Sequence, residues 1–232
     1  MPTDSTLTSE SLLALLQFTD SFFPTGAFAH SFGLESYVQD GSVHNRETLE
    51  SFLRAALHYG IRTGDALAVA SAYHATEVNR IEHLDQRLSA MKISRESREG
   101  SVKIGKQFLR NAGTFAESEM LDEYLKRIQS GKCAGHHAIA YGLVASGAKI
   151  DLRSTLLGYL HAFVVNQVSA AVRLIPLKPT DGQRIIQHVR SDLIEVGDFA
   201  CIAVMEDLGG FTPGLDIQSM RHESLYSRLF IS

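Results

Sequence analysis

The sequence predicts an all-α protein. Apolar residues recur at spacings of three and four along most of the chain, and no run alternates between apolar and polar residues as a half-buried strand would. Ser, Thr, Asn and Gly stand at the ends of these periodic segments, where helix caps are expected. A chain of 232 residues can bury one sizeable core. We therefore predict a single compact domain over residues 1–232, with about ten helices around central apolar helices.

The helices of the N-terminal half begin at recognisable caps. Thr8 or Ser9 is expected to begin the first helix, and Ser31 suits the start of the second. Asn45 is expected to cap a third helix, in which apolar residues repeat at three and four positions from Leu49 to Ile61. Further helices are predicted over 66–75, 81–91 and 102–112.

A charge cluster, RESRE, precedes the last of these segments. Arg95 and Glu99 are its only oppositely charged pair with i,i+4 spacing. We expect a solvated ion pair there, of little consequence for stability.

The C-terminal half contains the most apolar helices. A helix over 121–128 is expected to end before Gly131, and the segments 137–150 and 152–175 are apolar nearly all round, which places them in the middle of the domain. Thr180 and Gln183 suggest a capping box for a helix over 185–193. A last core helix is predicted over 199–208.

Composition argues against several classes of function. A formal net charge of −4 disfavours phosphate-driven binding of nucleic acid. Two cysteines do not make a disulfide framework and fit a reducing compartment. The first residues lack the basic region of a secretory signal, and polar residues interrupt the longest apolar run, 156–175. We expect a soluble intracellular protein.

The stretch Asp20–Tyr37, DSFFPTGAFAHSFGLESY, separates two predicted helices with an apolar turn. Three of its four phenylalanines, Phe22, Phe23 and Phe28, are too apolar for a freely solvated connector, so we expect them to pack on the domain. A proline and a glycine restrict the backbone and permit positive φ. The stretch is therefore predicted to be a stiff aromatic corner.

A polar trio, His30, Ser31 and Glu35, lies in the same stretch. It fits either a buried corner between helices or the site of a small helical hydrolase. The hydrolase interpretation is the weaker one, because neighbours on a helix point in different directions. The chain also lacks a G-x-S-x-G elbow, a phosphate-binding loop and an H-E-x-x-H motif. We assign no catalytic residue and no cofactor.

Cys133, His136 and His137 form a C-x2-H-H arrangement after a glycine. Thiolate and imidazole ligands suit zinc, nickel or copper. A closed site needs a further ligand, and nothing nearby in the sequence supplies one. The segment is therefore either a metal site or an ordinary loop before a helix.

The tail, residues 210–232, mixes apolar residues with arginine and histidine. Chain ends are usually polar and fray, whereas this combination is enriched at protein interfaces. Two interpretations are open. The tail either docks on its own domain or becomes ordered when it meets a partner.

Four segments of the chain resemble the UreF family of urease accessory proteins. They are FFPTGAFAHSFGLE, SRESREGSVKIGKQFL, SAAVRLIPLKPTDGQR and SMRHESLYSRLFIS, which occur in the family's order and span about residues 11 to 232. The resemblance implies an all-helical, cytoplasmic, non-catalytic homodimer. Such a protein binds UreD (UreH in some organisms), recruits and modulates the GTPase UreG, and serves as a nickel-insertion chaperone for the urease apoprotein.

The resemblance also assigns partner contacts by position. Arg228 is the tail residue of most interest, because guanidinium bridges carboxylate and carbonyl groups rigidly. Arg173 matches a basic position facing the GTPase, although its place at a predicted helix C-terminus also allows a purely structural dipole contact. The implied partner-binding residues are Phe28, His30, Glu35, Arg173, Arg221, His222, Glu223, Tyr226, Ser227, Arg228, Leu229 and Phe230.

The alternative from another class is a nickel- or zinc-binding metallochaperone that uses Cys133, His136 and His137. With the family resemblance, Asp20–Tyr37 is interpreted as a rigid aromatic corner that shapes a partner-facing surface beside the tail.

Overall fold

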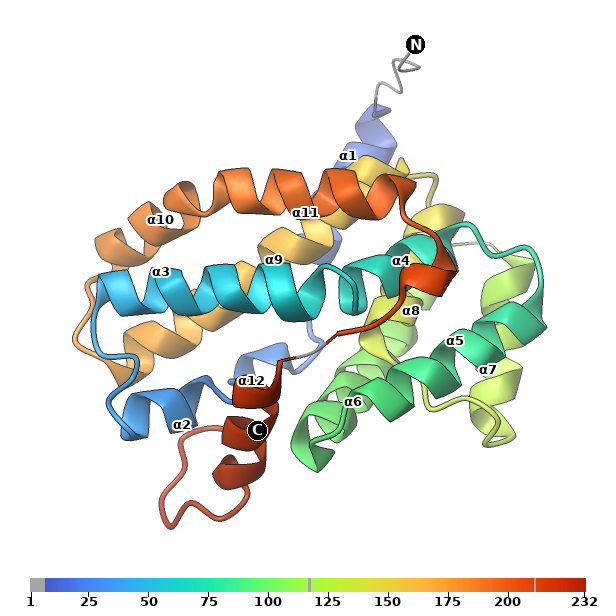
Figure 1. Cartoon of the computed structure of the whole chain (residues 1–232). Coiled ribbons are helices and arrows are strands. Elements are labelled where there is room, and N and C mark those ends of the chain that lie inside the picture. Colours follow the sequence, from blue (N-terminus) through green and yellow to red (C-terminus); the bar gives the residue numbers. More distant parts are fainter. Residues whose placement is uncertain (1–6, 117, 211) are drawn as a thin grey trace.

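The computed structural model describes residues 7–116, 118–210 and 212–232. Within these ranges the chain forms twelve α-helices and no β-strand, so the predicted all-α class is confirmed (Figure 1). The helices are α1 (Ser9–Thr19), α2 (Leu34–Gln39), α3 (Arg46–Ala55), α4 (Asp65–Tyr73), α5 (Val78–Met91), α6 (Arg95–Ala112), α7 (Glu119–Gln129), α8 (His137–Gly147), α9 (Leu152–Leu174), α10 (Pro179–His188), α11 (Arg190–Ile202) and α12 (Pro213–His222). Three short 3-10 turns, at 27–29, 113–115 and 205–207, and a π-helical extension of α3 at 56–61 join them.

The core surrounds three apolar helices, α4, α8 and α9. Helices α1, α4, α10 and α11 all contact the long helix α9, whose length and composition would also suit a membrane span. In the most apolar part of α9, 56% of the residues are buried inside the domain, as expected of a central core helix. Gly142 allows α4 and α8 to approach closely, since a Cβ atom at this position would collide with the backbone oxygen of Val69.

Two of the predicted caps are confirmed. Thr8 accepts a hydrogen bond from the Ser11 backbone nitrogen at 3.1 Å, and Asn45 accepts one from the Thr48 backbone nitrogen at 2.9 Å. The prediction for Ser31 was wrong by three residues. Helix α2 begins at Leu34, because Gly33 at its N-cap has a left-handed φ of +88°.

The C-terminal third departs most from the sequence prediction. The Thr180 capping box is wrong, because α10 begins at Pro179 and the Asp181 carboxylate accepts from the Lys178 backbone nitrogen at 3.1 Å. The helices predicted over 185–193 and 199–208 are instead α10 and α11, which meet at Val189.

Helix α12, the first half of the tail, was not predicted at all. Its buried residues are Gln218, Ser219 and His222, so it lacks the apolar stripe by which sequence analysis finds a helix. Figure 1 shows α12 beside α2 and near α6, with the chain end next to them.

Candidate functional site

The N-terminal turn, residues 20–37, is only partly buried. Phe23 joins an aromatic cluster, with its ring centroid 5.9 Å from that of Phe18 and 5.6 Å from that of Phe108. Phe22 and Phe28 are 92% and 59% exposed, so the prediction that all three phenylalanines pack on the domain was wrong for these two. The turn therefore has an anchored inner side and an apolar outer side.

The terminal segment, residues 223–232, lies against this turn. The Ile231 backbone nitrogen donates to the Ala29 carbonyl at 2.8 Å, and the Phe32 backbone nitrogen donates to the Ser232 carbonyl at 3.0 Å. The Ser31 backbone nitrogen donates to the same Ser232 oxygen. Phe32 adopts a left-handed φ of +50°, uncommon for a non-glycine residue. Of the two interpretations of the tail, this conformation is the docked one.

The carboxylate of Glu35 binds the backbone of the terminal segment. Glu35 is 3% exposed, and its carboxylate accepts from the backbone nitrogens of Leu229 at 2.7 Å and Phe230 at 3.1 Å. His222 Nε2 is a further partner at 2.9 Å. A buried carboxylate requires such donors, and charge-assisted hydrogen bonds are stronger than neutral ones. Glu35 thus joins α2, α12 and the terminal segment.

His222 lies between two carboxylates. Its Nε2 is 2.9 Å from Glu35 and its Nδ1 is 2.7 Å from Glu96, in a side chain with no exposed surface. Arg228 Nη1 contacts the other Glu96 oxygen at 2.8 Å. Glu35 and Glu96 therefore hold His222 from both sides, and Glu96 also holds Arg228.

Arg173 connects α9 with both segments of the site. Its guanidinium carbon lies 3.7 Å from the ring centroid of Phe28 and 4.3 Å from that of Phe230. Nη2 donates to the Phe28 carbonyl at 2.9 Å, and Nε donates to the Ser169 carbonyl of its own helix at 3.2 Å. Arg173 therefore makes both the helix-end contact and a bridge between the turn and the terminal segment.

The charge cluster at the start of α6 also belongs to this site. Arg95 contacts Glu223 at 2.8 Å, so the predicted Arg95–Glu99 pair was wrong. A Cβ atom at Gly100 would lie 3.1 Å from His30 Nδ1 and 3.3 Å from Ser232 Oγ. Only a residue without a side chain fits here easily, which sequence analysis did not detect.

The twelve residues assigned by resemblance separate into two layers. His30, Glu35, His222 and Phe230 are buried and hold the segments together. Tyr226 is fully exposed and Leu229 is 58% exposed, and the remaining six are exposed or half-buried. Sequence reasoning missed Glu96, Gly100 and Asn166, which donates to the His30 carbonyl at 3.0 Å. The only signal for these three residues in the sequence was their position in, or close to, the segments that resemble UreF.

The polar trio contains no nucleophile–base pair. His30 Nδ1 pairs with Ser232 Oγ, and the Ser31 hydroxyl accepts from the Glu35 backbone nitrogen at 3.4 Å. All three residues are at most 4% exposed. Their arrangement serves the docking of the terminal segment and gives the hydrolase interpretation no support.

The C-x2-H-H residues do not converge on one point. His136 pairs with Ser101 at 3.0 Å and Ser89 at 2.8 Å. His137 packs among aromatic rings, 5.4 Å from that of Phe108. Among the described residues, no group of three or more His, Cys, Asp or Glu side chains is placed to hold a metal ion.

Protonation also disfavours metal binding at this loop. Burial, and after it the negative charge of Asp85, raises the pKa of Cys133 to about 12. The thiol is therefore protonated at neutral pH. The Asp85 carboxylate accepts from the backbone nitrogens of Ala134 at 2.6 Å and Gly135 at 3.1 Å. In this conformation the loop is held by Asp85.

Fold and site together define an all-α protein whose site is a composite surface, formed where a C-terminal segment covers an N-terminal turn. The UreF family model matches residues 43–190. Three proteins named "Urease accessory protein UreF" are similar over 95% of this chain. That of Lachnoclostridium phytofermentans is 39% identical with 98% of its length covered, that of Bacillus sp. (strain TB-90) 37% with 99%, and that of Paenarthrobacter aurescens 36% with 97%. The chain belongs to the UreF family.

Proposed function

We propose that this protein is a urease accessory protein that works as a scaffold in nickel insertion. It binds UreD (or UreH), recruits and modulates the GTPase UreG, and acts on the urease apoprotein as a cytoplasmic homodimer without catalysis of its own. The observation that supports this most is the convergence of separate segments on one surface. The N-terminal turn, the start of α6, Arg173 and the terminal segment all meet there.

The buried layer of this surface gives the exposed layer a fixed shape. Glu35 and Glu96 hold His222, and the backbone nitrogens bound to Glu35 position Leu229 and Phe230. Phe28, Tyr226 and Leu229 then face outward together with Arg228. Aromatic and arginine side chains are the most frequent energetic anchors of protein interfaces. The exposed layer is the contact surface for UreD and UreG.

The terminal segment is weakly anchored by apolar contacts, which suits a segment that rearranges on binding. Residues 226–229 are all exposed, and Phe230 is its buried large apolar side chain. Most of the remaining attachment is polar and is exchangeable with a partner's donors and acceptors. Partner binding replaces part of these contacts.

Substitution of Arg228 tests the contact directly. Arg228→Ala is expected to reduce the recovery of cognate UreD and UreG in pull-down, because it removes an exposed guanidinium from the contact surface. The Arg228–Glu96 pair is partly exposed, so its loss changes stability by no more than about 1 kcal/mol and leaves the helical circular dichroism unchanged.

Arg153→Ala is the matched control. Arg153 pairs with Asp198 at 2.8 Å and, like Arg228, is partly exposed. It lies on α9, about 30 Å along the helix from Arg173. Its substitution is expected to leave pull-down intact. Unaltered recovery of both partners by Arg228→Ala would remove Arg228 from the contact surface.

A further inference from the structure

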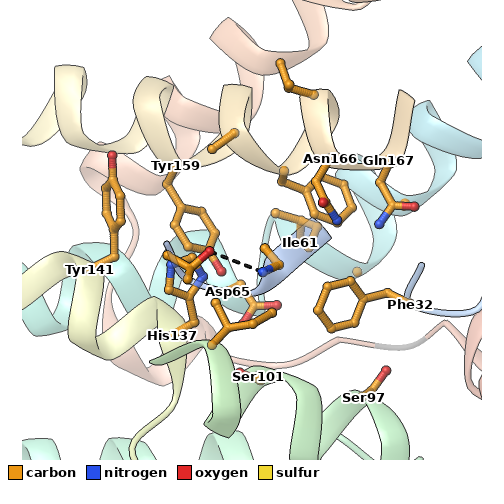
Figure 2. Close-up of a pocket in the computed structure, with 18 of the residues that line it drawn as sticks. Phe32, Ile61, Asp65, Ser97, Ser101, His137, Tyr141, Tyr159, Asn166 and Gln167 are labelled. Atoms are coloured by element: carbon orange, nitrogen blue, oxygen red, sulfur yellow. Dashed lines mark hydrogen bonds between the residues drawn. The ribbon is translucent and has the colours of Figure 1, made fainter. Parts of the chain in front are cut away.

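A cavity of about 430 Å³ lies beneath α9 and is bordered by the N-terminal turn, including Phe28 (Figure 2). Helix α9, the π-helical extension of α3, and the starts of α4, α6 and α8 contribute the other walls. Small-molecule sites commonly have volumes of about 300–1,000 Å³ and mainly apolar walls. The walls here are largely aromatic and include Phe18, Phe32, Phe52, Tyr141, Tyr159 and Phe163.

Gln167 lines this cavity without a partner for either polar atom. Its side chain has no exposed surface, and neither Oε1 nor Nε2 has a hydrogen-bond partner. Leaving a buried amide unpaired costs about 1–3 kcal/mol, and such groups are rare in folded proteins. Figure 2 shows Gln167 and Asn166 projecting from α9 on the same side as Phe32. The amide is therefore available to an occupant that both donates and accepts.

Two other groups on the cavity wall also lack a partner. Asp65 Oδ2 accepts a hydrogen bond from the Lys92 ammonium at 2.8 Å, while Asp65 Oδ1 has no hydrogen-bond partner. The Tyr141 hydroxyl is unpaired as well. Gln167 and Asp65 thus offer an amide and an acceptor to whatever fills the space, while the Tyr141 hydroxyl points toward α9, away from both (Figure 2).

The groups that await a partner carry no uncompensated charge. Burial lowers the pKa of His137 to about 4 and raises the pKa values of Tyr141 and Tyr159, so these side chains are neutral at pH 7. Lys92 compensates the charge of Asp65. At the α12 border, burial raises the pKa of Asp216. Transfer of an unpaired charged ligand into such a space is costly.

We propose that the cavity binds a small uncharged organic molecule that carries an amide-type N–H and C=O pair on an aromatic body. A carboxamide matches Gln167 because both present a donor and an acceptor side by side. A further N–H of the ligand suits Asp65 Oδ1, and the ring packs on the aromatic walls. This site goes beyond the proposed scaffold function and does not depend on it.

Benzamide is the probe for this proposal, measured by ligand-observed NMR and thermal shift on the full chain. We expect it to bind and to raise the melting temperature. Benzoate and benzylamine have the same ring with a negative or positive group and are expected to bind at least tenfold more weakly. In wild-type protein with labelled tyrosines, benzamide is expected to shift the Tyr141 and Tyr159 ring resonances, which requires no variant.

Gln167→Leu is the matched variant. Gln167→Leu keeps a side chain of similar size and removes the unpaired amide, so we expect the fold to be retained. If the melting temperature of Gln167→Leu falls, Gln167→Met is used in its place. Either variant is expected to weaken benzamide about tenfold and to leave toluene binding unchanged. The proposal is overturned if benzamide fails to bind, which would indicate a cavity that holds water only. Equal benzamide affinity in wild type and variant, or binding of benzoate or benzylamine as tight as that of benzamide, would also overturn it.

Discussion

Glu35 shows how one buried side chain determines the shape of an exposed surface. It is almost fully buried, and its two oxygens are hydrogen-bonded to two backbone nitrogens of the terminal segment and to His222. The resemblance assigned it to partner binding. Its burial favours a positioning role in the proposed function, in which Leu229 and Arg228 make the contact.

Replacement of Glu35 by glutamine separates these roles. Glu35→Gln keeps the shape of the side chain but removes the charge that His222 faces and introduces donors where acceptors are needed. We expect the free energy of unfolding to fall by about 1–3 kcal/mol and pull-down of UreD to weaken. Urea denaturation and pull-down measure the two effects.

Glu123→Gln is the control for this prediction. Glu123 is partly exposed and contacts Lys126 on its own helix at 2.6 Å. Its substitution is expected to leave both stability and pull-down as in wild type. If Glu35→Gln behaves in the same way as this control, Glu35 does not hold the terminal segment.

His137 and His136 make stability depend on pH. Burial lowers both pKa values to about 4, so between pH 4 and about 6.5 the unfolded chain binds protons that the folded chain does not. The free energy of unfolding must therefore fall as pH falls through this window.

His137→Phe is expected to reduce this dependence. Phenylalanine suits a position whose ring lies 5.2 Å from that of Tyr159. Loss of one titrating group lowers the slope by up to about 1.4 kcal/mol per pH unit, as measured by urea denaturation between pH 4.5 and 6.5. An identical slope in wild type and variant would show that His137 takes up its proton in the folded state.

At the scale of elements, the site depends on a close approach between α6 and the terminal segment. Gly100 leaves room for His30, Phe32 and Ser232, each of which would lie 3.1–3.3 Å from an added Cβ atom. Alanine is the better helix former, so a substitution here sets helix propensity against docking of the segment.

Gly100→Ala is expected to leave α6 helical and to displace the terminal segment. Hydrogen exchange at the amides of Leu229, Phe230 and Ile231 then becomes faster. Gly113→Ala is the control, because a Cβ at Gly113 would meet only Leu121, at 4.0 Å. Equal exchange at these amides in both variants would mean that the segment accommodates the methyl group.

The elements that sequence analysis predicted well are those whose signal is local. Helix α3 combines a capping residue with an apolar stripe, and α9 is apolar nearly all round. Helix α12 escaped prediction because Gln218, Ser219 and His222 are buried through polar contacts made far along the chain, such as that of Ser219 with Ser94 at 2.7 Å. Local periodicity carries no information about such partners.

Pairings within the site were equally out of reach of sequence analysis. Arg95 was paired with the nearest suitable acid on its own helix, whereas its partner is Glu223, 128 residues away. The unpaired state of Gln167 likewise depends on which helices surround it. The family resemblance indicated the segments that matter, but only the fold shows which of their residues face outward.

At the scale of the whole molecule, the core positions two features, the composite surface and the cavity, which share Phe28 of the N-terminal turn. Helix α9 carries Arg173 at the composite surface and Gln167 at the cavity, and the other central helices, α4 and α8, contribute to the cavity walls. The proposed scaffold function concerns the surface alone. It requires that the terminal segment docks on the domain in the free protein and engages the partners in the complex.

Copurification with cognate UreD and UreG, comparing the full chain with a variant that lacks residues 224–232, decides whether this surface recruits the partners. We predict that the truncated protein stays helical and dimeric, because the segment supplies little of the core. It is expected to lose both partners and to leave urease inactive. A truncated protein that recovers UreD and UreG and activates urease fully would contradict the proposed function of this surface.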